Sequence, residues 1–110
     1  MVRFYLESLV EGGRQLRRIA VHPLPFRVGR LHGLSLYLAS ESVSKEHAEI
    51  ESREGVLWVR DLGSKNGTFV RGRRISGPAE LSDGDELCLG SLLLVFRRDS
   101  APRSTETESV

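Results

Sequence analysis

The chain consists of short runs of apolar, β-prone residues separated by glycine, proline and small polar residues. Val, Phe, Tyr, Ile and Leu dominate the runs, and pairs such as Gly12-Gly13 and Glu54-Gly55 separate them. Such runs, bounded by turn signals, are typical of β-strands. We therefore expect strands at Val2–Leu9, Leu16–Val21, Phe26–Val28, Leu34–Leu38, Ala48–Ser52, Val56–Val59, Thr68–Val70, Glu86–Leu89 and Leu92–Phe96.

Alternation within the runs supports this interpretation. Leu34–Leu38 alternates Leu with Ser and Tyr, and a period of two places the three leucines on one face of a strand. No helical stripe of useful length is found. Many short strands with a turn signal every eight or so residues are typical of a sandwich or a barrel. The eleven glycines suit this architecture, because tight turns need the positive φ that glycine reaches cheaply. The pattern predicts an all-β fold.

The composition changes at Asp99. The segment Asp99–Val110 is rich in Ser, Thr and Glu and has no large apolar residue before Val110. Such a segment cannot bury enough surface to offset the entropy lost on ordering. A length of 110 residues is typical of one domain. We therefore expect one all-β domain at 1–98 and a flexible tail or linker at 99–110.

Charge and cysteine content narrow the function classes. Lys and Arg number 16 and Asp and Glu 15, a net charge of +1, whereas nucleic-acid binders usually carry a strong basic excess. The single Cys88 excludes an internal disulfide and an all-Cys metal site. There is no signal-peptide pattern, and no apolar run of about 18 residues that could span a membrane. We expect a soluble cytoplasmic domain with neither nucleic-acid nor membrane partners.

Three polar clusters, each next to an expected strand, offer what an anion needs. They are Gly29-Arg30, the segment 44–47 (Ser-Lys-Glu-His) and the segment 63–68 (Gly-Ser-Lys-Asn-Gly-Thr). Together they supply a guanidinium, hydroxyls, ammonium groups, a carboxamide and glycine-rich backbone N–H groups. No obvious nucleophile is paired with a base. The inventory therefore predicts recognition of an anion and not its chemical conversion.

In this order the clusters resemble the signature of the forkhead-associated (FHA) domain family: Gly-Arg, then Ser-x-x-His, then Asn-Gly. The resemblance covers roughly residues 3–98. It implies a two-sheet β-sandwich with its ligand site on loops at one end. It also implies a phosphothreonine-peptide binding module that is not an enzyme. The matching residues are Gly29-Arg30, Ser44-Lys45-Glu46-His47, Ala48-Glu49-Ile50, Asp61-Leu62-Gly63-Ser64, Asn66-Gly67, Gly84-Asp85 and Leu89-Gly90.

The resemblance assigns three residues to the phosphate. The family uses the Arg of Gly-Arg, here Arg30, whose planar guanidinium meets two phosphate oxygens and stays charged. Ser44 is expected to donate its hydroxyl. Lys45 stands where the family most often has Arg, and lysine keeps the charge but loses the bidentate fork. The resemblance also implies phosphothreonine over phosphoserine, because the threonine methyl fills a small apolar pocket.

Ser64, Lys65 and Asn66 are expected to form the second side of the site. Lys65 replaces the Thr that is common at this position in the family. Asn66 is implied to bond the main chain of the bound peptide, since a carboxamide both donates and accepts hydrogen bonds. Asn66-Gly67 also favours a type I′ hairpin turn, and both roles can hold together. Gly67 is expected to shape the loop.

The resemblance makes His47 structural, with its imidazole hydrogen-bonding beneath the loop to fix the Ser44 segment, and Gly29 shapes the neighbouring turn. Taken alone, a histidine near Ser44 would suggest a Ser–His hydrolase. However, there is no Gly-x-Ser-x-Gly elbow and no acidic residue clearly placed to orient the ring. His22 and His32 are too isolated to predict a metal site. We expect no metal and no cofactor.

Arg71 occupies the position of an Asn in a second Asn-Gly of the family. We expect it to face peptide residues C-terminal to the phosphothreonine and to favour acidic ones there. The alternative is a solvated arginine beside Arg73 and Arg74.

The expected partner is a phosphothreonine-containing protein, with a Ser/Thr kinase involved indirectly. Thr105 and Thr107 lie beside glutamates, so a phosphorylated tail could fold back into the site or be captured by a second copy. An ordinary acidic linker is the alternative. Two other functions stay open: a phosphate-independent structural or protein-interaction β-sandwich, and a small hydrolase using Ser44 and His47.

Overall fold

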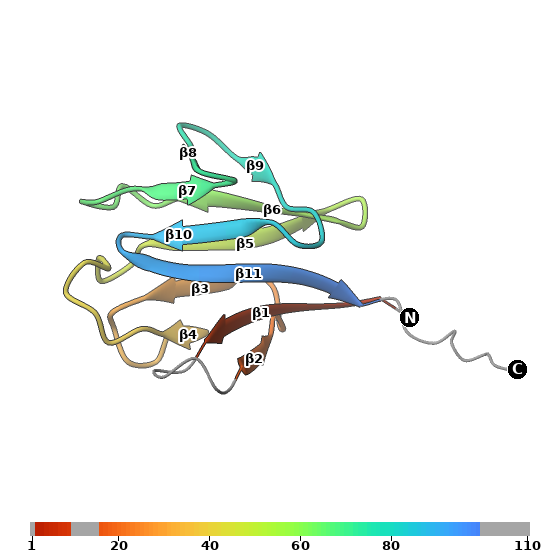
Figure 1. Cartoon of the computed structure of the whole chain (residues 1–110), viewed down its shortest axis with the longest axis horizontal. Helices are drawn as coiled ribbons and strands as arrows, with labels where there is room; N and C mark the ends of the chain where they lie inside the picture. Colours follow the sequence, from red (N-terminus) through yellow and green to blue (C-terminus); the bar gives the residue numbers. More distant parts are fainter. Residues whose placement is uncertain (1, 10–15, 100–110) are drawn as a thin grey trace, which may run out of the picture.

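The computed structural model describes residues 2–9 and 16–99, and these residues form strands and no helix. Figure 1 shows the strands packed as two layers. One sheet has the order β2-β1-β11-β10-β7-β8 and the other β4-β3-β5-β6-β9. Only β3 and β4 pair in parallel; the other pairings are antiparallel. The two-sheet sandwich expected from the sequence is confirmed. No helix in the described residues is long and apolar enough to cross a membrane.

The strand bounds follow the sequence pattern closely. The six-stranded sheet comprises β1 (Arg3–Leu9), β2 (Leu16–Ala20), β7 (Thr68–Val70), β8 (Arg73–Arg74), β10 (Glu86–Leu89) and β11 (Leu92–Asp99). The five-stranded sheet comprises β3 (Phe26–Gly29), β4 (Leu36–Tyr37), β5 (Ala48–Arg53), β6 (Val56–Asp61) and β9 (Ala79–Glu80).

Three short strands differ from the expectation. Only Leu36–Tyr37 of the expected Leu34–Leu38 is a strand, although Leu36 is buried and Ser35 and Tyr37 are exposed, as the alternation requires. The pairs in β8 and β9 were not expected, because neither carries an apolar pattern. They form because β8 follows a two-residue turn from β7 and β9 pairs with β6.

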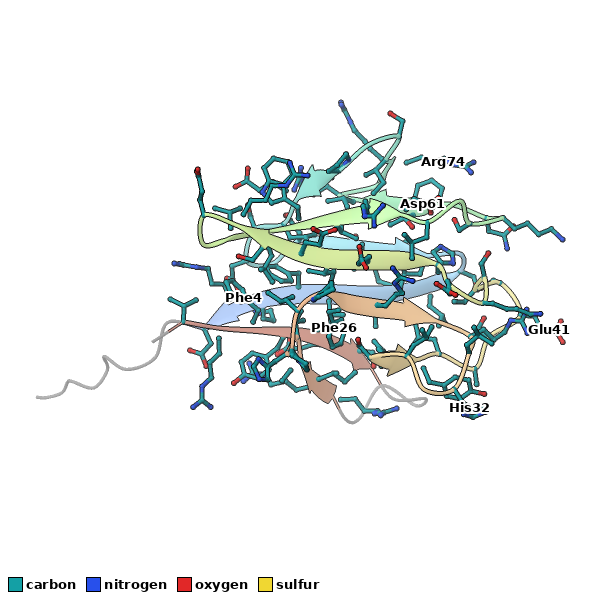
Figure 2. The ribbon with its side chains drawn as sticks, turned by 180° about the vertical axis from the view of Figure 1, so that it is seen from behind. Phe4, Phe26, His32, Glu41, Asp61 and Arg74 are labelled. Atoms are coloured by element: carbon teal, nitrogen blue, oxygen red, sulfur yellow. The ribbon has the colours of Figure 1, made fainter. Side chains whose placement is uncertain are left out.

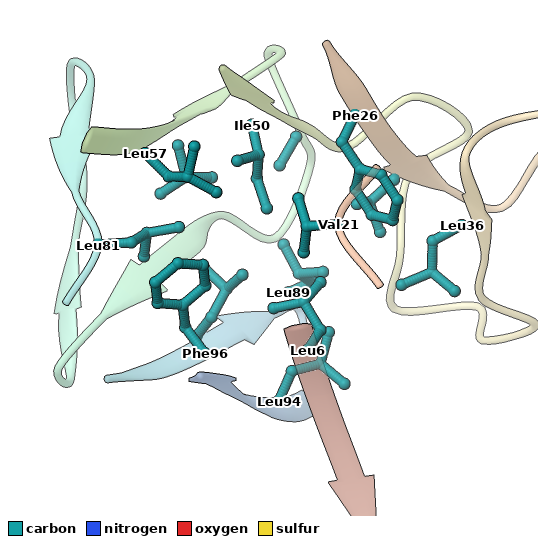
Figure 3. Packing of buried hydrophobic residues seen from close by; sticks show 14 of the residues in the cluster. Leu6, Val21, Phe26, Leu36, Ile50, Leu57, Leu81, Leu89, Leu94 and Phe96 are labelled. Carbon is teal, nitrogen blue, oxygen red and sulfur yellow. The ribbon is translucent and has the colours of Figure 1, made fainter. Parts of the chain in front are cut away.

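The core lies between the sheets and is made by alternate residues of each strand. In β6 Leu57 and Val59 are buried and Trp58 is only half-buried, because its side chain lies on the opposite face. In β11 Leu94 and Phe96 are buried and Leu93 is 49% exposed. Figure 3 shows buried side chains from both sheets meeting in one cluster. Each such side chain contributes about 1.5–3 kcal/mol on burial.

A buried carboxylate joins three strands of the five-stranded sheet. Glu49 on β5 is only 4% exposed and stands opposite Arg27 of β3 and Arg60 of β6. Arg27 donates to its Oε2 at 3.0 and 3.2 Å, and Arg60 to its Oε1 at 2.7 and 3.1 Å. Desolvation by burial acts to raise the pKa of Glu49, but the hydrogen bonds from Arg60 and Arg27 outweigh it. The pKa of Glu49 therefore lies below its ordinary value.

We expect Glu49→Gln to lower the free energy of unfolding by about 1–3 kcal/mol at pH 7, because two charge-assisted partners are lost. A depressed folded-state pKa gives stability that is present above the ordinary value of 4.5 and is lost as pH falls through the folded-state value. The difference between wild type and variant, measured by urea unfolding, should therefore shrink between pH 7 and pH 3. Glu46→Gln removes an exposed ion pair to Arg27 and should cost at most about 1 kcal/mol. A pH-independent difference for Glu49→Gln would contradict this assignment.

Candidate functional site

The three polar clusters meet at one end of the sandwich because the strands that flank them end or begin there. β3 ends at Gly29, β5 begins at Ala48, β6 ends at Asp61 and β7 begins at Thr68. Backbone hydrogen bonds join the resulting loops, including one from Leu62 N–H to His47 C=O at 2.9 Å. Figure 2 shows His32, Glu41 and Arg74 at this end of the molecule.

Gly29 is fixed by a close approach of backbone to backbone. A Cβ on Gly29 would lie 2.1 Å from the carbonyl oxygen of Lys45 and 2.9 Å from Leu34 Cδ1. The next residue, Arg30, donates its backbone N–H to Ser44 C=O at 3.0 Å. Any side chain at position 29 would therefore push the Arg30 turn away from the loop that carries Ser44.

The guanidinium of Arg30 is held at one point and is otherwise free. Its Nε donates to the backbone carbonyl of Val43 at 3.0 Å, while the residue is exposed. Within residues 2–9 and 16–99 no carboxylate pairs with Arg30, whereas Arg27, Arg60 and Arg71 are each ion-paired. The terminal Nη groups of Arg30 therefore remain available to an anion.

His47 connects two loops through its buried ring. The residue is 0% exposed, Nδ1 accepts the backbone N–H of Ser44 at 3.0 Å, and Nε2 lies 2.8 Å from the carbonyl oxygen of Gly67. Because Nδ1 accepts, the proton must be on Nε2, which donates to Gly67. The imidazole therefore fixes the distance between the Ser44 loop and the Asn66-Gly67 loop, as the sequence predicted.

The Ser44 hydroxyl makes a further bond between the two loops. Its oxygen accepts the backbone N–H of Lys65 at 2.9 Å, and no acceptor for its proton is found among the described residues. The hydroxyl can therefore donate to a ligand. Both ring nitrogens of His47 are bonded to backbone groups, so neither is placed to take a proton from Ser44. This geometry does not form the nucleophile–base pair that a hydrolase would need.

Asp61 builds the loop that follows β6. Its carboxylate accepts the backbone N–H groups of Gly63 and Ser64, each at 2.9 Å, and the hydroxyls of Ser64 and Thr68. Desolvation acts to raise the pKa of Asp61, but these hydrogen bonds outweigh it and lower the pKa below its ordinary value. Asp61 is among the residues that match the family signature, but the sequence alone does not predict this loop-building role.

The structure places Ser64 inside this loop and not on its surface. Ser64 is buried, and its hydroxyl donates to Asp61 and accepts the backbone N–H of Gly67 at 2.9 Å. Its proton already has an acceptor. The expectation that Ser64 contacts a ligand is therefore not supported, and its position is that of a loop-building residue.

Asn66 is exposed and anchors the loop tip. Its Nδ2 donates to the carbonyl of Ser42 at 2.9 Å, which leaves Oδ1 as an acceptor. Ser42 in turn bonds Ser91, and a Cβ on Gly90 would lie 2.2 Å from the Ser42 carbonyl oxygen. Sequence reasoning missed Ser42 and Ser91, since serines in loops carry no distinctive signal. Gly90 was visible only as part of the matching Leu89-Gly90 pair.

Two exposed lysines complete the cationic character of this end. Lys45 and Lys65 lie on the two bonded loops, and neither forms an ion pair within the described part of the chain. Gly67 has φ 91°, a conformation that favours glycine. The structure therefore brings Arg30, Ser44, Lys45, Lys65 and Asn66 to one end of the sandwich.

Arg71 is not brought to this group. It lies in the β7–β8 turn with φ 53°, donates its backbone N–H to Glu86 at the start of β10, and is ion-paired with Asp85. Gly67 instead bonds Gly90, beyond the other end of β10. Gly90 is four residue steps along the strand from Glu86, a distance of about 13 Å. The β7–β8 turn therefore places Arg71 near the Glu86 end of β10, and its contact with the peptide stays a prediction.

Comparison with known proteins agrees with this geometry. Residues 26–90 match the family model of the FHA domain. The glycogen accumulation regulator GarA of Mycolicibacterium smegmatis is 36% identical over 74% of this chain and 49% of its own length. The chain thus spans less than half the length of such curated relatives.

In the described residues no group of three or more His, Cys, Asp or Glu could hold a metal ion.

Two solved structures are similar throughout the sandwich. The first is Mycobacterium tuberculosis EmbR in complex with a low-affinity phosphopeptide, with a TM-score of 0.76, 30% identity, and 86% of this chain and 24% of that chain covered. The second comes from a structural and functional analysis of phosphothreonine-dependent FHA domain interactions. Its TM-score is 0.76, with 27% identity and 86% and 95% of the two chains covered.

We expect His47→Ala to lower the free energy of unfolding by about 2–4 kcal/mol, because it leaves a cavity, removes the only partner of the Ser44 N–H among the described residues and removes one of the two donors to the Gly67 carbonyl. His22→Ala, at an exposed position, should change it by less than about 0.5 kcal/mol. Urea unfolding measures both. In the wild type, long-range ¹⁵N–¹H correlation NMR should find the ring proton of His47 on Nε2. A proton on Nδ1 would contradict the proposed bridge.

Proposed function

This chain belongs to the FHA domain family, and we propose that it is a non-catalytic module that binds phosphothreonine peptides in signalling. The observation that carries the proposal is the set of unused donors at the loop end. Arg30 and Lys45 are exposed and Ser44 is half-buried, and each retains a donor that has no partner among the described residues. A phosphate dianion accepts charge-assisted hydrogen bonds from all three residue types.

Each residue has a distinct role in this proposal. Arg30 binds the phosphate through its Nη groups, Ser44 donates its hydroxyl, and Lys45 adds a point charge. Asn66 bonds the peptide main chain, and Lys65 contributes charge from the facing loop. The loop-building residues are Gly29, His47, Ser64 and Gly67.

The similar structures support the ligand class. EmbR was solved with a phosphopeptide, and the second structure belongs to a study of phosphothreonine-dependent FHA interactions. A preference for phosphothreonine over phosphoserine follows from the family resemblance. The ligand is therefore a protein marked by a Ser/Thr kinase, and we place the module in the cytoplasm, where ATP-dependent kinases act.

We expect Arg30→Ala to weaken binding of a phosphothreonine peptide at least tenfold, because a hydrogen bond to a charged group contributes about 1.5–3 kcal/mol. Fluorescence anisotropy against unphosphorylated and phosphoserine versions of the same peptide measures this loss. Arg98→Ala removes the same charge at the end of β11 away from the loops and should leave the affinity unchanged. Equal binding of the three peptides by the wild type, or equal losses of affinity in both variants, would contradict the proposal.

The tail offers a ligand within the same chain. The last described residue, Asp99, pairs with Arg3 at the end of β11 away from the loops, and Leu92 begins β11 beside the Gly90-Ser91 turn. Seven residue steps of strand span about 24 Å. Thr105 is six steps beyond Asp99 and can extend at most about 22 Å, and Thr107, eight steps beyond, at most about 29 Å. To reach the loops of its own domain, the segment after Asp99 would have to run back along β11 almost fully extended. A second copy sets no such limit on reach, so we propose that the phosphorylated tail binds the site of another copy.

Phosphorylation of Thr105 or Thr107 in the full chain should therefore produce concentration-dependent self-association. Sedimentation velocity of the phosphorylated and unphosphorylated chains measures it. Arg30→Ala should return the phosphorylated chain to the monomer, since the site can no longer hold the phosphate. A phosphorylated chain that stays monomeric at about 100 μM while it still binds added phosphopeptide would show that the tail is not a ligand.

A further inference from the structure

Arg74 lies against the peptide-binding loops although it is distant from their motifs. It is on β8, opposite Phe69 of β7. A Cβ on Gly67 would be 2.8 Å from Arg74 Nε, 3.0 Å from its Cζ and 3.2 Å from Phe69 Cε1. The guanidinium therefore lies over the space that a side chain at position 67 would fill. Figure 2 shows Arg74 at the same end of the molecule as His32 and Glu41.

The charge of Arg74 is available. The residue is exposed, and none of the ion pairs formed by the described residues involves it. Arg71, three residues earlier, is by contrast paired with Asp85. A side chain that packs against Gly67 has fewer positions to sample than a freely solvated arginine. Less conformational entropy is then lost when it binds an anion.

The surface beside Arg74 is hollowed. A groove of ≈ 400 Å³ runs along the segment that connects β7 to β9. Its lining combines cationic side chains with small and apolar ones. The lining residues are Val70, Arg71, Arg73, Arg74, Ile75, Ser76, Gly77, Pro78 and Ala79. The groove has room for a side chain and carries positive charge.

The groove lies next to the phosphate loops. The Gly67 carbonyl bonds Nε2 of His47, and Nδ1 of the same ring bonds the Ser44 N–H. Gly67 and Ser44 are thus bridged by one imidazole ring, and the Arg74 guanidinium lies beside Gly67. An extended peptide advances about 3.3 Å per residue. A ligand that places its phosphate at Ser44 and crosses Asn66-Gly67 reaches Arg74 within a few residues.

We propose that Arg74 forms a second anion subsite, which selects an acidic or phosphorylated side chain a few residues away from the phosphothreonine. The inference rests on the proposed function, because it places a second contact on the same ligand. Replacing Gly67 by any other residue would displace Arg74, so the loop glycine that shapes the site also opens this subsite.

Anisotropy measurements on the full chain test the subsite. The probe is a phosphothreonine peptide with neutral flanks, and Asp is placed singly at each of the four positions on either side. One position should tighten binding to the wild type by two- to fivefold, the range of exposed ion pairs. A second arm places phosphoserine at the same position. A gain with Asp identifies an acidic residue as sufficient, and a gain with phosphoserine alone identifies a second phosphate.

Arg74→Gln should abolish the preference and leave the affinity for the neutral peptide within about twofold. Arg74→Glu should favour a Lys at the same position. The matched control is Arg98→Gln, which removes an exposed arginine at the end of β11 away from the loops. It should retain the preference, and thermal melting confirms that each variant is folded.

Two results overturn the inference while the proposed function stands: no preference for an anion at any position, or a preference that persists in Arg74→Gln and so belongs to Lys45 or Lys65. Absence of phosphothreonine-dependent binding to every peptide overturns the inference and the proposed function together.

Discussion

The buried ring of His47 is the contact on which the rest of the site depends. It is bonded on one side to Ser44 N–H and on the other to Gly67 C=O, so two loops from different strands share a single neutral imidazole. The Ser44 N–H has no other partner among the described residues, and a partly buried N–H without a partner is costly, so the two ring bonds hold the loops at one separation. The Ser44 hydroxyl accepts the backbone N–H of Lys65, which is a further bond between the same two loops. The position of the phosphate donor is therefore a consequence of core hydrogen bonding.

Two glycines also fix the shape of the site, because each allows two backbone segments to approach closely. Gly29 faces the Lys45 carbonyl and Gly90 faces the Ser42 carbonyl, each too closely for a Cβ. These contacts hold opposite ends of the 42–45 segment, and His47 holds it from below. A loop fixed at three points loses little conformational freedom when it binds a ligand. This explains how the exposed Arg30 and the half-buried Ser44 are positioned without being part of the core.

Alternation predicted the all-β fold because it reports directly which face a residue occupies, and the family resemblance specified the two-sheet sandwich. It predicted the Arg30, Ser44 and Asn66 cluster because those residues adjoin strand ends. It did not predict β8 or β9, whose two-residue strands depend on pairing with β7 and β6. Spacing along the chain did not place Arg71: β7 runs from Thr68 beside Leu89 to Val70 beside Leu87, so the next residue lies at the Glu86 end of β10. Ser64 was misjudged because residue type does not tell whether a hydroxyl already has an acceptor.

The distribution of ion pairs separates stability from recognition in this small domain. On the outer face of β3, β5 and β6 the cations of Arg27 and Arg60 are neutralised by Glu49, which is buried. At the loop end Arg30, Lys45 and Lys65 have no such partner among the described residues, and they repel one another. A bound phosphate dianion offsets that repulsion and also accepts hydrogen bonds from these groups. The unbound domain thus has cations without a counter-charge at one end. They lie on loops whose conformation is fixed by the hydrogen bonds of His47 and Asp61.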